Sequence, residues 1–384
     1  MRIAVDYTAA ARQGAGIGRY TRELISAILA ADASHRYVLM AATAGLGERW
    51  QCEAARLRAL ADGDRLTLRP LPLTDDWLAR LWQRLRIPIP AEWITGGVDL
   101  FYSPDFVLPP LRHGTPALLT VHDLSFLRHP ETFPNALRTY LERAVPRSVD
   151  RADHVLADSH ATRRDLIELL GVPSDKITTL HLGVSSRFSP QPRPDECARL
   201  EARYDLGPKP TILAVGTVQP RKNIQLLIEA LDALRANHDV TLALAGKPAW
   251  LSDPILEAAA QRDDVRVLGF VADEDLPALY RQARVFAFPS LYEGFGLPPL
   301  EALACGTPVV ASNASSVPEA VGDAGLLIDP LDLPAWIHAL DRALTDASLR
   351  ETLRTRGLDR AARFTWARAA RQWLTTVQTV ARLR

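Results

Sequence analysis

Short apolar, β-branched runs alternate with longer amphipathic stretches along nearly the whole of this 384-residue chain. Runs of strand length separated by stretches of helix length predict β-α units around parallel sheets. The predicted strands are residues 3–5, 37–40, 66–68, 100–102, 117–121, 155–157 and 177–180 in the first half, and 211–215, 241–245, 265–268, 285–288, 308–311 and 326–328 in the second. The expected fold class is therefore α/β with doubly wound sheets.

The alternation is interrupted at residues 188–194, where Pro190, Pro192 and Pro194 occur at every second position. Proline at this density does not fit a helix interior or a central strand, so the segment is interpreted as a hinge. The chain is also longer than one ordinary core requires. We therefore expect two Rossmann-like domains, residues 1–187 and 188–365, followed by a helix over residues 366–384.

Composition excludes some classes of function. Lys and Arg together number 45, as do Asp and Glu, and this balance argues against nucleic acid as a partner. The cysteines Cys52, Cys197 and Cys305 form no C-x-x-C pair, which is typical of a reducing compartment. No run approaches the roughly 20 apolar residues of a membrane span. A cytoplasmic location is therefore expected.

The most informative string of the second half is Glu293-Gly294-Phe295-Gly296-Leu297-Pro298-Pro299-Leu300-Glu301, which follows a predicted strand and leads into a helix. The glycines allow the backbone to approach a ligand closely, and the prolines suit a first helical turn with free N–H groups. Carboxylates accept hydrogen bonds from sugar hydroxyls, so Glu293 and Glu301 are candidate sugar contacts. A tight turn and an acid favoured by the helix dipole would explain either acid alone.

A second string, Gly216-Thr217-Val218-Gln219-Pro220-Arg221-Lys222-Asn223, joins the predicted strand 211–215 to a helix predicted over residues 224–234. Such a junction combines helix N–H groups with two positive side chains, Arg221 and Lys222, and therefore suits a diphosphate. An exposed cationic loop is the alternative interpretation of this string.

In the first half, residues 14–20 join the first strand to the first helix and read G-x-G-x-G. Dinucleotide-binding loops read G-x-G-x-x-G and are followed by an acid for the ribose, and this sequence has neither. A nicotinamide-dependent oxidoreductase, which would also use two doubly wound domains, is therefore disfavoured. Gly16 and Gly18 are candidates for a loop that faces a phosphate or an acceptor.

His122 follows the predicted strand 117–121, where ligand-binding residues of such sheets belong, and is a candidate polar contact to a sugar. A structural histidine is the alternative. Two strings, Asp62-Gly63-Asp64 and Asp273-Glu274-Asp275, match a common metal-binding Asp-x-Asp pattern. The first is interpreted as a turn and the second as a helix cap, so no metal site is predicted.

Residues 77–87 predict an amphipathic helix with Leu78, Leu81, Trp82 and Leu85 on one face and three arginines elsewhere. Such a helix can lie on a membrane surface, which predicts a peripheral membrane contact through Trp77 to Ile87. The alternative is that the apolar face packs on its own domain.

Together these residues resemble the retaining glycosyltransferases of family 4, and the resemblance covers nearly the whole chain. Its motifs are residues 14–20, Val121-His122-Asp123, Asp158-Ser159, 220–223, 288–290, 293–301, 306–310 and 317–322. The resemblance implies the GT-B fold: two Rossmann-like doubly wound domains facing a central cleft. The N-terminal domain would bind the acceptor and the C-terminal domain the nucleotide-sugar, with the final helix crossing back to the N-terminal domain.

The resemblance also implies a role for each candidate residue. Glu301 would bind the nucleotide ribose, and Glu293 would bind the transferred sugar. Arg221 and Lys222 would neutralise the diphosphate, and His122 would contact the sugar from the N-terminal domain. The other implied contacts to the nucleotide-sugar are Gly16, Gly18, Gly269, Phe270, Gly294, Phe295, Gly296 and Leu297. Thr217 stands where the family often has Arg, which shifts weight to Arg221 and Lys222.

The implied activity is retaining transfer of a hexose from a nucleotide-sugar to a sugar or lipid-linked acceptor in glycan or polysaccharide biosynthesis. The branch resembled is that of bacterial mannosyltransferases of polysaccharide and O-antigen assembly. This favours GDP-mannose as donor, with a UDP- or ADP-sugar as the alternative. No cofactor and no metal are expected. A catalytically silent transferase subunit is a further alternative; it predicts a broken Lys222, Glu293 and Glu301 set, which is intact here.

Overall fold

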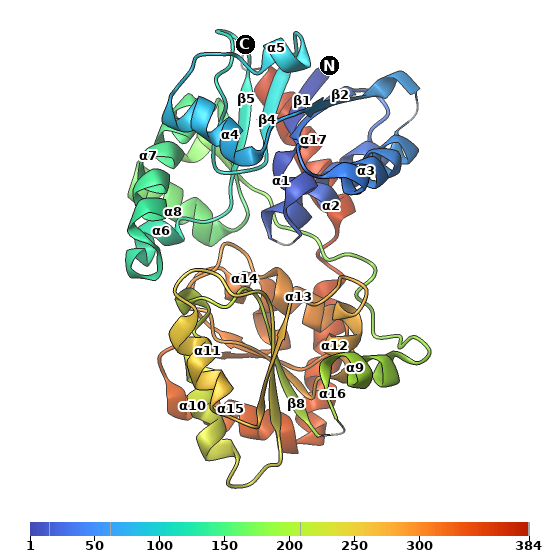
Figure 1. The fold of residues 1–384 in the computed structure, drawn as a ribbon, viewed down its shortest axis with the longest axis vertical. Helices are drawn as coiled ribbons and strands as arrows, with labels where there is room; N and C mark the ends of the chain where they lie inside the picture. Colours follow the sequence, from blue (N-terminus) through green and yellow to red (C-terminus); the bar gives the residue numbers. More distant parts are fainter. Residues whose placement is uncertain (15, 62, 208, 383–384) are drawn as a thin grey trace. The chain divides into compact units, whose positions relative to one another are not determined.

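All the strands expected from the sequence are present in the computed structural model, which describes residues 1–14, 16–61, 63–207 and 209–382, and they form two sheets (Figure 1). The first unit contains Met1–Leu124, Thr139–Gly183 and Trp366–Arg384, and the second contains Ser125–Arg138 and Val184–Thr365. Four residues of the predicted features lie outside the described residues: Ala15 of the glycine-rich loop, Asp62 of the first Asp-x-Asp string, and Leu383 and Arg384 at the chain end.

In the first unit, the described strands form a seven-stranded parallel sheet in the order β3-β2-β1-β4-β5-β6-β7. The strands are β1 (Arg2–Asp6), β2 (Arg36–Ala42), β3 (Leu66–Leu71), β4 (Leu100–Ser103), β5 (Ala117–Val121), β6 (His154–Ala157) and β7 (Ile177–Thr179). The strand order reverses between β1 and β4. The carboxyl ends of these two neighbours therefore form a topological switch point, where ligands of such sheets usually bind.

In the second unit, the described strands form a six-stranded parallel sheet in the order β10-β9-β8-β11-β12-β13. They are β8 (Thr211–Val215), β9 (Thr241–Ala245), β10 (Val265–Gly269), β11 (Val285–Phe288), β12 (Val309–Ser312) and β13 (Leu326–Ile328). Its switch point lies between β8 and β11. The predicted class, α/β with two doubly wound sheets, is confirmed.

Helices cover both faces of each sheet, which explains why the central strands are apolar along their whole length (Figure 1). The helices around the first sheet are α1 (Thr8–Arg12), α2 (Ile17–Ala31), α3 (Gly47–Leu60), α4 (Asp75–Ala79), α5 (Glu92–Thr95), α7 (Asn135–Arg151), α8 (His160–Leu170) and α17 (Trp366–Arg382). The second unit contains α6 (Ser125–Arg128), α9 (Glu196–Tyr204), α10 (Ile224–Leu234), α11 (Asp253–Ala260), α12 (Leu276–Gln282), α13 (Leu297–Ala304), α14 (Val317–Val321), α15 (Leu333–Thr345) and α16 (Ala347–Ala361).

The last helix, α17, belongs to the first unit although the chain reaches it from the second. It lies beside α2, where the red and blue ribbons adjoin in Figure 1. Its buried apolar residues recur with helical spacing: Trp366, Ala369, Ala370, Trp373, Val377 and Val380. The Trp373 ring lies 5.3 Å from the ring of Tyr102 on β4, and Gln372 donates to the carbonyl oxygen of Thr179 at 2.6 Å. The final helix therefore completes the core of the first unit.

The unit boundaries differ from the predicted boundary at residue 187 in two places. Ser125–Arg138, expected in the N-terminal domain, belongs to the second unit. There the indole nitrogen of Trp250 donates to the Thr132 carbonyl at 2.9 Å, and the rings of Phe133 and Trp250 lie 5.6 Å apart. The second unit also starts earlier, at Val184, whose N–H donates to the carbonyl of Phe364 at 3.0 Å. These contacts join residues distant in sequence and leave no local pattern.

The prediction of one continuous amphipathic helix over residues 77–87 is wrong. Helix α4 ends at Ala79 and is followed by a π-helical turn, η2 (Arg80–Arg84). A π turn takes an extra residue, so it breaks the helical register on which the single apolar face depended. As a result Leu78 is buried, Leu81 and Trp82 are half-buried, and Leu85 is exposed.

The packing of α17 generates a stability prediction. Trp373 is fully buried, so Trp373→Ala should lower the free energy of unfolding of the first unit by about 3–5 kcal/mol through lost burial and a cavity. Trp93 is 69% exposed and provides the matched control, for which Trp93→Ala should change stability by about 0.5 kcal/mol or less. Scanning calorimetry measures both. Equal losses for the two variants would contradict the role given to α17.

Candidate functional site

Two predicted motifs meet at the switch point of the second sheet. The loop after β8 carries Arg221 and Lys222 within a short 3-10 turn, η5 (Pro220–Lys222), and the loop after β11 carries Glu293. Because β8 and β11 are neighbours, the two loops leave the same edge of the sheet side by side. The N–H of Leu291 donates to the Arg221 carbonyl at 2.9 Å, which links the loops directly. The sheet order therefore brings together residues about seventy positions apart.

Glycines allow the loops at this edge to approach one another. Gly246, after β9, has φ +157°, and a Cβ there would lie 1.8 Å from the carbonyl oxygen of Gly216. Gly216 has φ +151°, and a Cβ on it would lie 3.3 Å from Cε of Lys222. The Lys222 stem thus runs over the Gly216 backbone and would be displaced by a larger residue at Gly216, whereas a larger residue at Gly246 would clash with the Gly216 backbone.

The central interaction is a buried cluster of charges. Nζ of Lys222 lies 2.6 Å from Oε1 of Glu293, and Nη1 of Arg221 lies 3.1 Å from Oε2. The same Arg221 nitrogen donates to the Tyr292 carbonyl. Glu293 is only 8% exposed. Burial of a carboxylate of this kind is tolerated when it is paired on both oxygens, as it is here.

The electrostatic state of Glu293 follows from these neighbours. Burial, the largest single effect, favours the neutral acid, but the charges of Lys222 and Arg221 together with hydrogen bonds outweigh it and lower the pKa of Glu293 to about 2. Glu293 is therefore an anion at neutral pH. It holds the ammonium and guanidinium groups in fixed positions at the carboxyl edge of the sheet.

The backbone between Glu293 and α13 is also fixed. The Ser315 hydroxyl accepts from the Glu293 N–H at 2.8 Å, and the Ser316 hydroxyl lies within 3.0 Å of the carbonyl oxygens of Glu293 and Phe295. Gly296, with φ +118°, precedes the first residue of α13, Leu297. The Phe295 ring is buried against Phe364, so this residue presents only its backbone to a ligand. The loop is a rigid turn that opens onto a helix N-terminus.

The remaining predicted residues of this unit lie on α13 and at the end of β10. Glu301, on α13, is 2% exposed and accepts from the hydroxyl of Tyr280 at 3.0 Å. Gly269, at the end of β10, has φ +64° and is followed by Phe270, which is 54% exposed. The Lys247 ammonium lies 4.7 Å from the centre of the Phe270 ring. An exposed ring held by a cation can stack on a planar ligand.

His122 lies in the first unit, at the end of β5. Its Nδ1 lies 2.7 Å from Oδ2 of Asp158, and its Nε2 lies 2.9 Å from the carbonyl oxygen of Pro104. Burial alone would lower the pKa of His122, but Asp158, Asp105 and the carbonyl raise it to about 9. The ring is therefore an imidazolium whose two N–H groups already donate to the protein. Its predicted contact with a sugar stays a prediction, and it would require one of these bonds to be exchanged.

The glycine-rich loop has a packing role. A Cβ on Gly18 would lie 2.3 Å from the Gln13 carbonyl oxygen and 2.7 Å from that of Ala9, so Gly18 allows α1 and α2 to touch. Gly16 has φ +57°, precedes α2, and has nothing within 4 Å of the place where its Cβ would be. Of Gly16 and Gly18, it is therefore Gly16 that retains space for a ligand.

The second Asp-x-Asp string has a structural explanation that differs from the predicted helix cap. Asp275 precedes α12, but its side chain makes no capping bond. It is fully buried and accepts from Arg199 at 2.9 Å, Arg203 at 2.7 Å and the Tyr204 hydroxyl at 2.9 Å. Asp275 therefore anchors α9 on α12.

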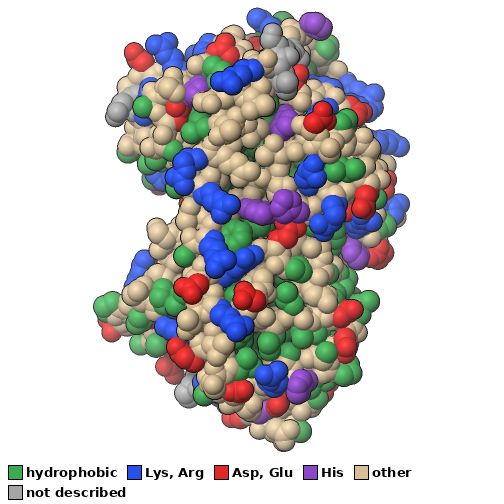
Figure 2. All heavy atoms as spheres, turned by 180° about the vertical axis from the view of Figure 1, so that it is seen from behind, with side chains coloured by type: hydrophobic (Ala, Val, Ile, Leu, Met, Phe, Trp, Pro, Cys, Tyr) green, Lys and Arg blue, Asp and Glu red, His purple; other side chains and the backbone are tan. Residues whose placement is uncertain are grey.

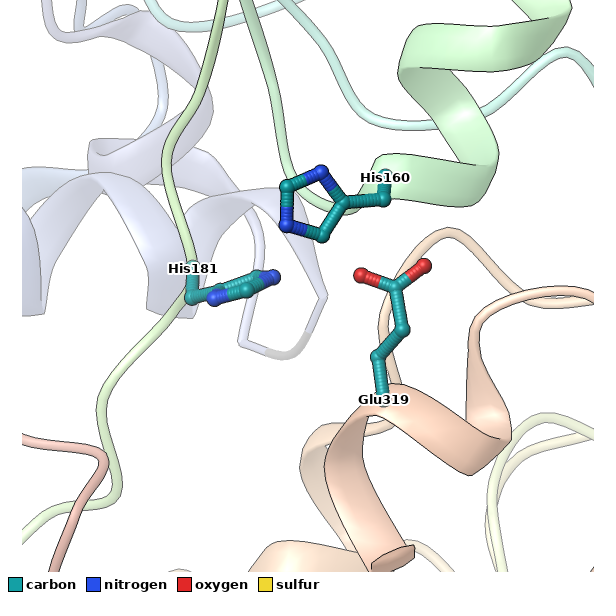
Figure 3. Close-up of side chains that lie close together, drawn as sticks. All are labelled: His160, His181 and Glu319. Carbon is teal, nitrogen blue, oxygen red and sulfur yellow. The ribbon is translucent and has the colours of Figure 1, made fainter.

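Sequence reasoning missed several residues that support these sites. Ser315, Ser316 and Tyr280 each hold a predicted residue in place, and Asp158, which the sequence named only as part of a motif, holds His122. Asp158 follows a predicted strand, which was a usable signal. A further pair, His160 and His181, has ring centres 5.2 Å apart at an interplanar angle of 84° in the first unit (Figure 3).

Comparisons with known proteins matched two family models and several relatives. The family described as "Glycosyl transferases group 1" matches residues 201–360, and "Glycosyltransferase Family 4" matches residues 14–188. The "O-antigen chain mannosyltransferase B" of Escherichia coli is 36% identical over 366 residues, covering 93% of this chain and 94% of that protein. The "Serotype-specific mannosyltransferase WbdA" of Escherichia coli is 33% identical over 261 residues, which are 65% of this chain and 32% of that protein.

Among solved structures, HepE of Anabaena in complex with UDP and glucose superposes with a TM-score of 0.74 at 19% identity. The superposition covers 99% of this chain and 100% of that one. At this identity the match establishes the fold alone.

The charge cluster predicts a specific dependence of stability on pH. The folded pKa of Glu293, about 2, lies below its ordinary value of 4.5, so its contribution is fully present above pH 4.5 and is lost as pH falls toward 2. Glu293→Gln should therefore lower the free energy of unfolding by roughly 3 kcal/mol at neutral pH. The difference from the parent should shrink steadily below about pH 4.5. Urea unfolding across this range measures it; a difference independent of pH would contradict the assignment.

Proposed function

Because the chain belongs to the family 4 glycosyltransferases, we propose that it transfers a hexose with retention from a nucleotide-sugar bound at the carboxyl edge of its second sheet. The observation that carries this proposal is the pair of cations, Arg221 and Lys222, held by Glu293 at the β8/β11 switch point. A diphosphate is the ligand that two adjacent fixed cations and a helix N-terminus recognise best.

The donor phosphates would take the place nearest the cations. In this arrangement Lys222 and Arg221 each share their charge between Glu293 and the diphosphate, and α13 contributes its first N–H groups. The backbone of Gly294 to Leu297 contacts the sugar and the phosphates. Glu293, whose carboxylate is ionised, accepts hydrogen bonds from hydroxyls of the transferred sugar.

The nucleoside would extend along the same edge of the sheet toward β10. Phe270 with Gly269 borders the base, and Glu301 binds the ribose. The Tyr280 hydroxyl, which donates to Glu301, orients its carboxyl group for that contact. These assignments are the ones that the resemblance to family 4 implies; Gly269 and Phe270 lie at the end of β10, whereas Glu301 lies on α13, which follows β11.

The proposed donor is GDP-mannose, and the proposed pathway is bacterial polysaccharide or O-antigen assembly. Two relatives whose names specify mannosyl transfer, one of them aligned over 94% of its length, support this choice. UDP- and ADP-sugars remain the alternatives, and a structural neighbour was solved with UDP and glucose.

In the proposed mechanism the departing diphosphate takes the proton of the attacking acceptor hydroxyl on one face of the donor sugar. The bond from the anomeric carbon to the phosphate oxygen breaks as the bond to the acceptor oxygen forms. Lys222 and Arg221 stabilise the charge that develops on the leaving group, and their fixed positions mean little reorganisation is needed. Catalysis then consists of positioning and electrostatics, without a metal.

The donor proposal predicts a selective loss of nucleotide affinity. Lys222→Ala should weaken nucleoside diphosphate binding about ten- to a hundredfold, since it removes a charge-assisted contact. Lys209, an exposed lysine paired with Asp239, is the matched control, and Lys209→Ala should bind like the parent. Calorimetry with GDP, UDP and ADP in excess EDTA measures affinity, base preference and metal independence together.

Two outcomes would overturn this assignment. One is equal affinity of the Lys222→Ala variant and the parent for the preferred diphosphate. The other is binding that vanishes in EDTA and returns with Mg²⁺ or Mn²⁺, because then a metal and not the two side chains would carry the phosphate charge.

A peripheral membrane contact is the second part of the proposal. In the first unit Trp77, Leu85, Ile89 and Trp93 are exposed, and the Arg80 guanidinium lies over the Trp77 ring. Arg84 and Arg86 are also exposed. Exposed tryptophans beside arginines suit the interface of an anionic bilayer. Among the described helices none is long and apolar enough to cross a bilayer. The contact would therefore bring the enzyme to a lipid-linked acceptor.

Vesicle sedimentation tests the membrane contact. Vesicles containing phosphatidylglycerol should pull down the parent, and they should recover much less of a Trp77→Ala, Leu85→Ala, Trp93→Ala variant. Leu331 is a highly exposed leucine of the second unit, so Leu331→Ala is the matched control and should sediment like the parent. Equal recovery of all three proteins would rule the contact out.

A further inference from the structure

The first unit contains a cavity of about 200 Å³ that the sequence did not predict. It lies at the carboxyl ends of β1 and β4, the switch point of the first sheet, where Asp6 ends β1 and Ser103 ends β4. Sites for drug-sized ligands run to ~300–1,000 Å³, so this one suits a single monosaccharide ring. Its position matches that of the charge cluster in the second sheet.

Four aspartates line the cavity: Asp6, Asp75, Asp76 and Asp105. Backbone N–H groups hold two of them, because Asp6 accepts from Thr8 at 3.0 Å and Asp105 accepts from Phe106 at 2.8 Å. Among the described lining residues there is no Lys or Arg. Arg12 pairs with Asp75 at 2.8 Å, and buried His122 acts on Asp105. The wall therefore keeps an excess of negative charge.

Burial makes the carboxylates of Asp6 and Asp105 dependent on hydrogen-bond donors. Burial raises the pKa of Asp105, and burial together with Asp105 raises the pKa of Asp6. Hydroxyl groups offset this cost of burial, because they donate hydrogen bonds to carboxylates without adding charge. A phosphate in the same place would add repulsion.

Two aromatic side chains complete the wall. Tyr140, on α7, also lines the cavity. Burial and the charge of Asp105 raise the pKa of Tyr140 to about 12, so its hydroxyl group is protonated and can donate a hydrogen bond. Trp82 is fixed by a hydrogen bond from its indole nitrogen to the Ile89 carbonyl at 3.1 Å. Aromatic faces pack against the C–H faces of sugar rings. The π turn η2 carries Trp82 and Gln83, and π turns occur frequently at functional sites.

A metal ion is a poorer occupant. Among the described residues, no three of these acids bring ligand oxygens within 4.8 Å of one another. The described carboxylates of the cavity therefore do not form a three-ligand cation site.

Building on the proposed function, we infer that this cavity binds the terminal monosaccharide of the acceptor as an uncharged polyol, and that its aspartates exclude an acceptor phosphorylated on that sugar. The inference deepens the proposed function by giving the acceptor a chemical class. It also assigns a role to the segment from Asp75 to Gln83 that is independent of membrane contact.

Saturation-transfer NMR on the full chain tests this inference with methyl α-D-mannopyranoside and mannose 6-phosphate as a matched pair. The parent should bind the neutral sugar at least about tenfold more tightly than the phosphate. Asp105→Asn should weaken binding of the neutral sugar about tenfold, through loss of a charged hydrogen-bond acceptor. Asp76→Asn should reduce the ratio of the two affinities, because it removes a negative charge that repels the phosphate of mannose 6-phosphate. Asp239→Asn, on the surface of the second unit, should change neither.

Nucleoside diphosphate affinity, measured in parallel, separates this inference from the proposed function. If the parent binds the diphosphate but neither sugar, or binds both sugars equally, the acceptor inference fails and the proposed function stands. If the diphosphate does not bind, the proposed function fails. Displacement of the neutral sugar by Mg²⁺ alone would reassign the cavity to a cation and overturn the inference.

Discussion

The site in the second unit depends on one buried carboxylate shared by two cations. At 8% exposure Glu293 stays ionised because Lys222 and Arg221 pair with it, and the two cations in turn gain a shared counter-charge. The cluster joins the loops after β8 and β11, and the close approach of Gly216 and Gly246 places the lysine stem over the backbone. The serines that hold the Glu293 backbone, Ser315 and Ser316, make the turn before α13 rigid. A diphosphate would thus meet donors that are already in position.

Each sheet has charged side chains at its topological switch point, but the sign of the charge is opposite in the two sheets. The switch point of the second sheet presents cations, which suit phosphates, whereas that of the first presents Asp6 and Asp105, which suit hydroxyls. Local charge of each sign is compatible with a chain whose acidic and basic residues are equal in number, and on the second unit both kinds are interspersed in the face drawn in Figure 2. Under the two proposals, the anionic donor and the neutral acceptor would each meet side chains of complementary character.

The sequence predicted the strands and helix α10 well because burial on both faces leaves an apolar run that is readable locally. It also identified Arg221, Lys222 and Glu293 as candidate site residues, because each lies in a loop that follows a predicted strand. It failed where a long-range contact or a local irregularity decides the structure. The π turn at Arg80–Arg84 has no counterpart in a regular helical period, and the bond between Trp250 and Thr132 joins residues more than a hundred positions apart. The cavity depends on the adjacency of β1 and β4, which only the sheet order reveals.

The most direct test of the central claim, that this chain is a retaining hexosyltransferase governed by the Glu293 cluster, is the anomeric configuration of its product. Proton NMR of GDP-α-mannose incubated with a mannose-terminated oligosaccharide and EDTA reports both donor consumption and the new linkage. The account predicts release of GDP and an α-mannosidic product from the parent, and almost none of this product from Glu293→Gln. A β-linked product, or full activity of Glu293→Gln, would contradict it.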